Sequence, residues 1–157
     1  MKIKNIELII YDFDGVMTDN RVLVFEDGKE AVFVNRSDGL AVNAIKKMGI
    51  DQIIVSTEKN SVVRFRAKKL GIPFIQSVAD KKKTVEKYLK KNKIQKEKVV
   101  FMGNDTNDKE VMGFIGWPAA PADAHPDVKK IARLKLKTKG GFGVVRELYN
   151  LLREAEK

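Results

Sequence analysis

The stretch Ile6-Glu-Leu-Ile-Ile-Tyr11, followed by Asp12-Phe-Asp-Gly-Val16, is the most informative part of this chain. Its first half is a short apolar run of the kind that forms a strand covered on both faces of a parallel sheet. Its second half places Asp12 and Asp14 two residues apart, directly after that strand. Two such carboxylates can share a divalent cation, and Asp12 can attack phosphorus while Asp14 handles protons. The same Asp-x-Asp-Gly pattern is also a turn signal in many loops, so its meaning depends on the rest of the chain.

Apolar runs alternate with helical patterns along the rest of the chain, and no internal repeat or low-complexity linker divides it. This rhythm predicts an α/β fold, a parallel sheet with helices on both faces. The expected core strands cover residues 6–11, 52–56, 74–76 and 99–102. The expected helices cover residues 40–48, 61–70, 82–92, 107–114, 127–132 and 144–155.

One segment interrupts this rhythm directly after the first strand. Two β-prone runs, Val22–Phe25 and Ala31–Val34, flank Asp27-Gly28, which predicts a tight β-hairpin, a flap over about residues 21–35. Ligands of open α/β sheets bind beyond the carboxyl ends of the strands, so the hairpin is expected beside the site. It is the only insertion long enough to form a lid, so no cap domain is expected. Its apolar side chains and open edge favour pairing with another copy.

Three further polar features follow predicted strands. Ser56-Thr57-Glu58 brings two hydroxyls that can donate to a phosphate oxygen, although they can equally cap a helix. Lys81 opens a helix and can neutralise a phosphoryl group as a point charge, but two more lysines follow it directly, which leaves the choice among them open. Gly103-Asn-Asp-Thr-Asn-Asp108 crowds carboxylate and amide groups at a strand end, where glycine lets the backbone approach a cation.

The composition narrows the function classes. The 157 residues fit one globular unit of about 100 to 200 residues, so we expect a single domain over residues 1–157. The absence of cysteine excludes disulfides, thiol catalysis and cysteine-ligated metals, and it fits a cytoplasmic location. The single histidine, His125, disfavours a multi-histidine metal site within one subunit. No apolar run approaches the about 20 residues of a membrane span, and the start does not have the pattern of a signal peptide, so no membrane partner is expected.

The charge is strongly basic, with 31 basic against 21 acidic residues and a formal net charge of +10. Such a surplus favours diffuse attraction to anions such as phosphorylated metabolites. The densest stretch, Lys81–Lys98, contains nine lysines, but its helical pattern makes it a solvated helix face. Aromatic side chains do not alternate with these lysines, so no nucleic-acid partner is expected. Binding of nucleic acid by the basic surface stays open as a separate class of function.

Together, Asp12-Phe-Asp-Gly15, Ser56, Lys81 and Gly103–Asp108 resemble, in order and spacing, the signature of the haloacid dehalogenase superfamily of phosphohydrolases. The resemblance covers about residues 6–150. It implies a Rossmann-like parallel sheet, Mg²⁺ as cofactor, and hydrolysis of a phosphoric monoester through an aspartyl-phosphate intermediate.

Within that superfamily, the short hairpin, Pro121–Pro126 and Gly140–Glu147 resemble one capless group. These are the phosphatases of phosphorylated 3-deoxy-2-keto sugar acids: octulosonate 8-phosphate, and the nononate and N-acylneuraminate 9-phosphates. The resemblance implies a homotetramer with the hairpins at its centre. It also implies that the tail, about residues 138–157, helps to close a neighbour's site, with Gly140–Gly143 reaching that site. A flexible loop before the last helix is the alternative for these glycines.

The resemblance also assigns roles to residues. Asp12 is the nucleophile, and Asp14 protonates the leaving sugar hydroxyl and then activates water. Ser56 and Lys81 hold the phosphoryl oxygens, and Asp108 fixes Lys81. Each of these residues lies in one of the four strand-end features.

For Mg²⁺, the resemblance implies a site made by the Asp12 carboxylate, the Asp14 main-chain carbonyl and Asn104. The superfamily usually has an aspartate at the Asn104 position. An amide oxygen is still a hard ligand but brings no charge, so Mg²⁺ affinity should fall or depend more on Asp12 and on the nearby Asp105. The substitution leaves a second class open: a domain that kept the fold but lost turnover and serves oligomerisation, like the phosphatase-like region fused to animal sialate cytidylyltransferases. The retained acids and Lys81 argue against it.

Substrate preference is expected to depend on the residues after Ser56. Octulosonate 8-phosphate phosphatases commonly continue with glycine and arginine, whereas here Thr57 and Glu58 follow. The closest resemblance is to nononate 9-phosphate phosphatases, in which a lysine one helix later, here Lys69, matches the glutamate. We therefore expect Thr57, Glu58 and Lys69 near the substrate and an ion pair between Glu58 and Lys69. Ordinary surface charges on a helix are the alternative.

Overall fold

The computed structural model describes residues 3–155, and it is built around one six-stranded parallel sheet with the strand order β5-β4-β1-β6-β7-β8. The strands are β1 (Leu8–Tyr11), β4 (Asp51–Val55), β5 (Phe74–Ile75), β6 (Val99–Met102), β7 (Trp117–Ala120) and β8 (Leu134–Lys135). Strand β1 lies at the centre and pairs with β4 on one side and β6 on the other. The carboxyl ends of β1, β4 and β6 therefore meet at one edge of the sheet, which is where the sequence places its polar features.

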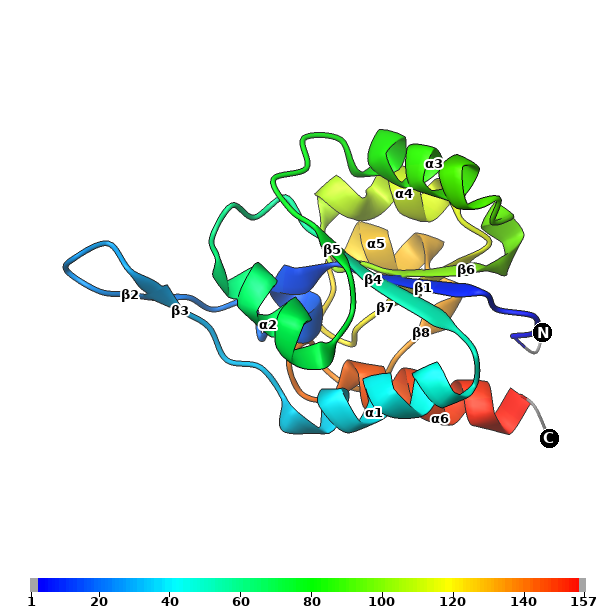
Figure 1. Ribbon diagram of the computed structural model, residues 1–157, viewed down its shortest axis with the longest axis horizontal. Helices are drawn as coiled ribbons and strands as arrows, with labels where there is room; N and C mark the ends of the chain where they lie inside the picture. Colours follow the sequence, from blue (N-terminus) through cyan, green and yellow to red (C-terminus); the bar gives the residue numbers. More distant parts are fainter. Residues whose placement is uncertain (1–2, 156–157) are drawn as a thin grey trace.

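Helices cover both faces of the sheet (Figure 1). The helices are α1 (Arg36–Lys47), α2 (Val62–Leu70), α3 (Lys81–Asn92), α4 (Lys109–Phe114), α5 (Pro126–Ile131) and α6 (Val144–Ala155). Helices α1, α2 and α6 pack on one face, and α3, α4 and α5 pack on the other. Within residues 3–155, none of these helices has the length and apolar character needed to cross a bilayer.

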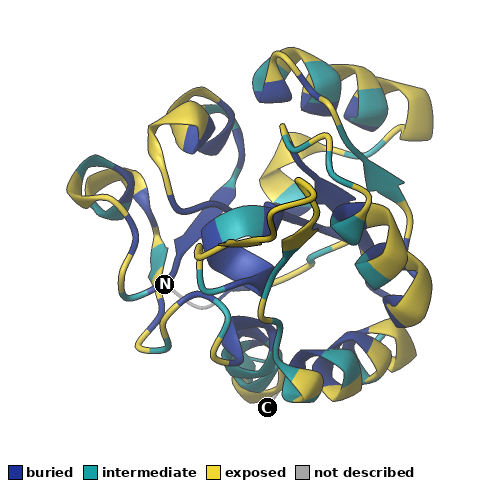
Figure 2. Ribbon diagram, turned by 90° about the vertical axis from the view of Figure 1, so that its left-hand side faces the viewer, coloured by how far each residue is buried: buried dark blue, intermediate teal, exposed yellow. Residues whose placement is uncertain are grey.

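The central strand is buried on both faces because its side chains alternate between the two helical layers. Ile9 and Tyr11 pack with α1 and α6, whereas Leu8 and Ile10 pack with α3 and α4. Figure 2 shows the consequence: the central strands of the sheet are buried, and most exposed positions lie on the outward faces of the helices, in loops and on the hairpin. Such a strand cannot shift its register without moving apolar side chains into the wrong layer, so the positions after Tyr11 are held firmly.

The predicted hairpin is present and projects from the body of the molecule (Figure 1). Strands β2 (Leu23–Val24) and β3 (Glu30–Ala31) pair antiparallel. Gly28 adopts a φ of +78° and closes the turn, as the Asp-Gly pair predicts. The hairpin is tied to the body at its base by a bridge between Thr18 and Val34.

The α/β fold, the parallel sheet, the four predicted strands and the six predicted helices are confirmed, with differences at their ends. Two strands were not predicted. Strand β7 contains Pro118 and two alanines, residues that strands disfavour, and β8 has only two residues. Helix α1 begins at Arg36 rather than at residue 40, because the Asn35 side chain accepts a hydrogen bond from the Ser37 N–H and caps the helix earlier.

Candidate active site

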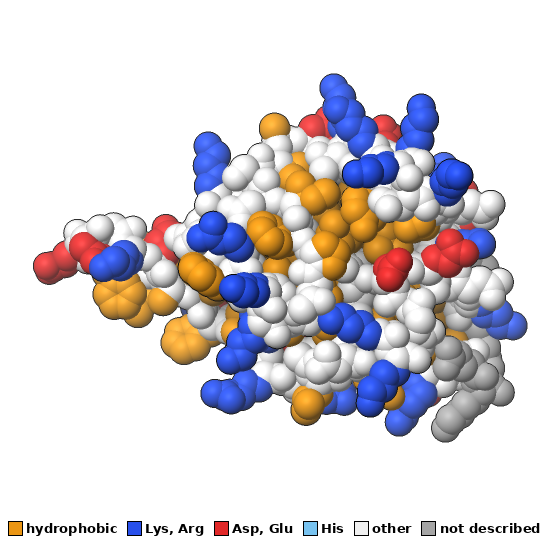
Figure 3. Space-filling view, in the orientation of Figure 1, with side chains coloured by type: hydrophobic (Ala, Val, Ile, Leu, Met, Phe, Trp, Pro, Cys, Tyr) orange, Lys and Arg blue, Asp and Glu red, His pale blue; other side chains and the backbone are white. Residues whose placement is uncertain are grey.

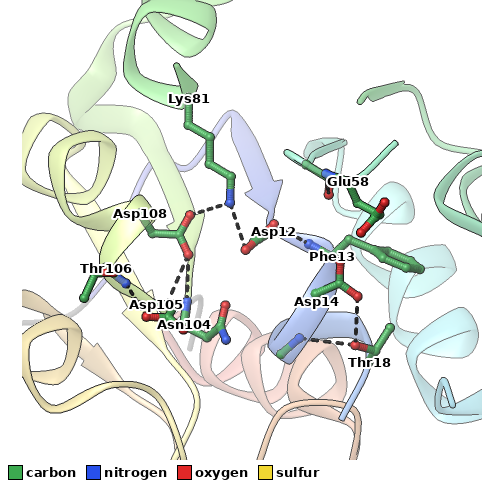
Figure 4. A network of polar contacts seen from close by, with 12 residues as sticks. Asp12, Phe13, Asp14, Thr18, Glu58, Lys81, Asn104, Asp105, Thr106 and Asp108 are labelled. Atoms are coloured by element: carbon green, nitrogen blue, oxygen red, sulfur yellow. Dashed lines mark hydrogen bonds and ion pairs between the residues drawn. The ribbon is translucent and has the colours of Figure 1, made fainter. Parts of the chain in front are cut away.

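Three charged side chains meet beyond the carboxyl ends of β1 and β6 (Figure 4). The ammonium group of Lys81 lies 2.8 Å from Asp12 Oδ2 and 2.6 Å from Asp108 Oδ1. All three side chains are buried. Asp12 extends β1, since its N–H donates to Met102 O, and Lys81 is the first residue of α3. The structure thus selects Lys81 from the three consecutive lysines and brings together residues that are 96 positions apart at most.

Burial and the ion pairs have opposing effects on the pKa values of Asp12 and Lys81. Burial and the nearby Asp108 raise the pKa of Asp12 to about 7, although Lys81 and the Phe13 N–H favour its charged form. Burial by itself would lower the pKa of Lys81, but Asp12 and Asp108 outweigh it and raise that pKa. Lys81 therefore stays a fixed positive charge that faces the Asp12 carboxylate.

Asp108 organises the loop that follows β6. Its Oδ2 accepts hydrogen bonds from the N–H groups of Asn104, at 2.9 Å, and Asp105, at 3.4 Å, while its other oxygen binds Lys81. A side chain at Gly103 would come within 2.7 Å of the Asp108 carboxyl, so this approach requires glycine. The Asp105 side chain instead accepts from the Thr106 N–H and is exposed. Asn104 is the member of this loop whose side chain faces the β1 loop.

Asp14 lies two residues beyond Asp12, in the tight turn Phe13–Met17. The Thr18 hydroxyl, 3.5 Å away, donates to Asp14 Oδ1, and the same hydroxyl accepts from the Gly15 N–H. Gly15 has a φ of +75°, and a Cβ on it would overlap the Asn104 amide. Burial and the charge of Glu58 raise the pKa of Asp14, so its carboxyl holds a proton to higher pH than usual. Thr18 was not singled out from the sequence, although a hydroxyl four residues after Asp14 could have suggested it.

A small cleft of about 140 Å³ opens beside Asp14, between the hairpin and the loop after β4. Glu30, Glu58 and Arg21 line it. Asn60 links its two sides, since its side-chain amide donates to Glu30 Oε2 at 2.8 Å and its N–H donates to Glu58 Oε1 at 2.8 Å. Glu30 and Asn60 were missed in the sequence, because nothing local shows that a hairpin residue reaches this loop.

The expected ion pair between Glu58 and Lys69 is wrong. Glu58 Oε1 accepts from the N–H groups of Lys59 and Asn60, which turns the carboxylate back onto its own loop. Lys69 lines a separate hollow of about 500 Å³ between α2 and the hairpin, together with Phe65 and Arg66. A separation of eleven residues along a loop and a helix does not determine which way the two side chains point.

The residues before Glu58 occupy different environments. Ser56 is buried, and its hydroxyl oxygen accepts from the Glu58 N–H at 3.0 Å. This leaves the Ser56 proton free to point elsewhere, since a hydroxyl can donate and accept at the same time. Thr57 is exposed. The structure therefore buries Ser56, exposes Thr57 and leaves Glu58 partly buried at the cleft beside Asp14.

The expectation that Gly140–Gly143 reaches a neighbour's site is wrong for its first two residues. Gly140 and Gly141 pack against the loop that carries Asp14 in their own chain, where a Cβ on either glycine would overlap the backbone of Gly15 or Thr18. The Gly141 N–H donates to Val16 O, and the Gly140 N–H donates to Asp123 Oδ1, both at 2.9 Å. The two glycines thus support the site within one chain.

The donor set suits a hard divalent cation. Asp12 supplies a carboxylate oxygen and Asn104 an amide oxygen, and the Asn104 side chain lies against the turn that carries the Asp14 carbonyl (Figure 4). Oxygen donors of this kind are those that Mg²⁺ prefers. Within residues 3–155, His, Asp and Glu side chains do not form any group of three that could hold a metal ion. A site for Mg²⁺ here would combine the side-chain oxygens of Asp12 and Asn104 with the main-chain carbonyl of Asp14.

Proteins similar to this chain include several named phosphatases. The chain is 34% identical to the 3-deoxy-D-manno-octulosonate 8-phosphate phosphatase of Escherichia coli K12 over 152 residues, 96% of this chain and 81% of the relative. The crystal structure of the phosphatase of this name from Yersinia pestis matches with a TM-score of 0.92 at 34% identity, covering 97% of this chain and 83% of that one.

A third match is to the 3-deoxy-D-manno-octulosonate 8-phosphate phosphatase from Moraxella catarrhalis, in complex with magnesium, phosphate and KDO. Its TM-score is 0.93 at 28% identity, and the match covers 98% of this chain and 88% of that one. Residues 42–148 match the model of the haloacid dehalogenase-like hydrolases. The strand-end carboxylates and the buried lysine agree with these matches. The chain therefore belongs to the haloacid dehalogenase-like hydrolases.

Proposed function

We propose that this chain removes the terminal phosphate of a phosphorylated 3-deoxy-2-keto sugar acid through an aspartyl-phosphate intermediate. Its family makes it a phosphoric monoester hydrolase with Mg²⁺ as cofactor. The observation that carries the proposal is the buried contact of Lys81 with both Asp12 and Asp108, at the end of the central strand. A nucleophile beside a fixed positive charge is what transfer of a phosphoryl group to a carboxylate requires.

The reaction takes place in two steps. Asp12 attacks phosphorus in line, the bond from phosphorus to the sugar oxygen breaks, and Asp14 gives its proton to that oxygen. Asp14 then takes a proton from a water molecule, which attacks phosphorus and breaks its bond to Asp12, so that inorganic phosphate leaves. The raised pKa of Asp14 supports its first role, since a carboxyl that holds its proton to higher pH can serve as an acid.

The remaining residues would position the phosphoryl group and balance its negative charge. Lys81 and the Ser56 hydroxyl hold its oxygens, and Asp108 keeps Lys81 in place. The Asp12 carboxylate, the Asp14 main-chain carbonyl and Asn104 would hold Mg²⁺. When bound, Mg²⁺ reduces the repulsion between the Asp12 carboxylate and the phosphate dianion.

For the leaving sugar, we propose a nononate or N-acylneuraminate 9-phosphate. Glu58 supports this choice, because it lines the cleft beside Asp14 and presents negative charge where an arginine would attract the carboxylate of a shorter sugar acid. The relatives favour the second candidate, octulosonate 8-phosphate, since that substrate is in their names. Because Glu58 does not form an ion pair with Lys69, the proposal of a 9-phosphate substrate rests on Glu58 alone.

A phosphate-release assay over sugar phosphates, with and without Mg²⁺, tests both candidates. We expect kcat/KM for the 9-phosphates to exceed that for octulosonate 8-phosphate, and Glu58→Arg to narrow or reverse the ratio. Glu26→Arg makes the same charge change on an exposed hairpin residue and should leave the ratio unchanged. A preference for the octulosonate in the unmodified protein selects the second candidate. Absence of release from every ester with Mg²⁺ would point to an oligomerisation module without turnover.

The last part of the proposal concerns the assembly of the protein, its location and its partners. We propose a homotetramer, supported by the exposed apolar residues of the hairpin (Figure 3). A cytoplasmic location and a lack of nucleic-acid partners stay predictions from composition. Light scattering, described below, tests the assembly.

A further inference from the structure

Asn104 occupies the position where the loop after β6 meets the loop after β1. Its N–H donates to Asp108 Oδ2 at 2.9 Å, and its carbonyl accepts from the His125 N–H at 2.8 Å. The backbone is thus held on both sides. Its side chain lies over Gly15, whose missing Cβ leaves the space for it, and the residue is only 8% exposed. The amide cannot turn into solvent without losing this packing.

The buried charges around this amide do not balance. In their ionised forms, Asp12 and Asp108 contribute two negative charges and Lys81 one positive charge, and their side chains are 7%, 0% and 1% exposed. The net formal charge of the three is therefore minus one. Because water is excluded from these groups, each unit of charge has a larger effect here than on the surface. Asn104 adds none.

The net charge of this buried group has opposite effects on the binding of the two ligands, Mg²⁺ and phosphate. A divalent cation brings the buried group to plus one, which is unfavourable by itself, because the cation must share the Asp12 carboxylate with the Lys81 ammonium 2.8 Å away. A phosphate dianion is attracted by that excess. A carboxylate at position 104 would instead bring the group to neutrality with the cation and would therefore remove this net attraction for the dianion.

We propose that Asn104, compared with a carboxylate at the same position, lowers the affinity of the site for Mg²⁺ and raises its affinity for phosphate. The site therefore holds Mg²⁺ weakly and holds phosphate, the product, tightly. This inference rests on the proposed function, since it takes Mg²⁺ and a phosphoryl group as the ligands. Its consequence is product inhibition: inorganic phosphate competes with the ester more strongly than it would with a carboxylate at position 104.

The test measures both ligands by isothermal titration calorimetry on the full chain. Mg²⁺ is titrated alone, and inorganic phosphate is titrated at saturating Mg²⁺. For Asn104→Asp we expect the Mg²⁺ Kd to fall about tenfold or more and the phosphate Kd to rise by about tenfold. The inhibition constant of phosphate in the hydrolysis assay should rise in parallel.

Two variants separate charge from structure. Asn107→Asp adds the same charge to an exposed position three residues later, and it should change either Kd by less than about threefold. Asn104→Ala removes the amide without adding charge, so it should weaken Mg²⁺ but leave phosphate binding within about threefold of the unmodified protein.

Opposite shifts in Asn104→Asp support the inference, and shifts of both ligands in the same direction, or of Mg²⁺ alone, overturn it. If Asn104→Asp does not fold by circular dichroism, a phosphate Kd that weakens in Asn104→Ala as much as the Mg²⁺ Kd overturns it as well. The binding measurements need no turnover. Opposite shifts in a protein that releases no phosphate from any ester would therefore reject the proposed function and retain this inference.

Discussion

At the end of β1, the Asp12 carboxylate is held by Lys81 and by the Phe13 N–H, which accounts for its orientation. The three buried charges of this group sum to a negative excess, so removing the charge of Asp12 leaves one positive and one negative charge. A neutral side chain of the same shape leaves Lys81 paired with Asp108. Chemistry and stability can therefore be separated at this residue.

Asp12→Asn should lower turnover by roughly 10³-fold or more, because an amide is a poor nucleophile toward phosphorus, and it should leave the fold intact. Phosphate release and circular dichroism measure the two effects. Asp51→Asn, an exposed residue at the opposite end of the sheet, is the control and should keep full activity. Retention of more than a few per cent of activity in Asp12→Asn would exclude a covalent role for Asp12.

Asp38 is a third buried carboxylate, and it belongs to α1, outside the group formed by Asp12, Lys81 and Asp108. Its Oδ1 accepts from the Val145 N–H at 3.2 Å and so joins α1 to the start of α6, while its Oδ2 has no hydrogen-bond partner. Burial raises its pKa to about 6, although the N–H groups of Arg146 and Val145 and the charge of Arg66 oppose this.

The sign of the pH effect follows from that shift. Between about pH 4 and pH 6 the folded protein keeps the Asp38 proton that the unfolded chain releases, so this group makes the free energy of unfolding fall as pH rises through that window. The loss is on the order of 2–3 kcal/mol. Asp38→Asn keeps an oxygen for Val145 and should remove this part of the dependence. Thermal or urea unfolding at pH 4.5 and pH 7 measures it, and equal pH dependence in both proteins would contradict the assignment.

At the scale of elements, the candidate site includes a contact between segments that are far apart along the chain. The segment before α6 presents Gly140 and Gly141 to the turn after β1, and its backbone lies too close to that turn for any side chain. The turn carries Asp14 and the carbonyl proposed for Mg²⁺. Its position is therefore set by the C-terminal segment as well as by β1.

Gly140→Ala should destabilise the fold by about 1–3 kcal/mol and lower kcat, since the added methyl group must displace the Gly15 backbone. Gly113→Ala is the matched control, because Gly113 lies in α4 with open space around its Cα. There alanine should be neutral or stabilising by about 0.5–1 kcal/mol. Urea unfolding and phosphate release measure both variants. If the two variants had equal stability and equal kcat, the contact of Gly140 with the turn that carries Asp14 would be unimportant.

At the scale of the whole molecule, the hairpin is the part that one chain leaves uncovered. Its apolar side chains include Phe33, which is 68% exposed, and Val24, which is 61% exposed. Figure 3 shows hydrophobic side chains on one side of the projecting hairpin. Adjacent exposed apolar groups and open strand edges favour association with another chain.

We therefore expect light scattering at micromolar concentration to give four times the chain mass of 17.7 kDa. Val24→Lys should shift the protein toward smaller species, because it places a charge in the apolar surface. Asp27→Asn changes the net charge by the same amount at an exposed polar position of the same hairpin and should keep the assembly. A monomeric mass for the unmodified protein would rule the tetramer out.

The amino-acid sequence alone was sufficient for four strands of the sheet, for the helices α1 to α6 apart from their exact ends, and for the four strand-end features. These depend on local patterns: apolar runs long enough for buried strands, helical spacing, and acids or hydroxyls directly after a strand. Because parallel strands point the same way, their carboxyl ends meet, so Asp12, Ser56 and Asn104 could be expected at one edge. Strands β7 and β8 have no such pattern, since they are strands only through pairing with their neighbours.

Only the tertiary structure decided the contacts between distant segments. Of three consecutive lysines, it is Lys81, the first residue of α3, whose side chain reaches Asp12. The Glu58 carboxylate binds the Asn60 N–H rather than Lys69. The tertiary structure also brought Gly140 against Gly15 within one chain. Such contacts depend on how helices and loops pack on the sheet. Their direction in space is set by the summed packing of the core, which the spacing of residues along the chain does not contain.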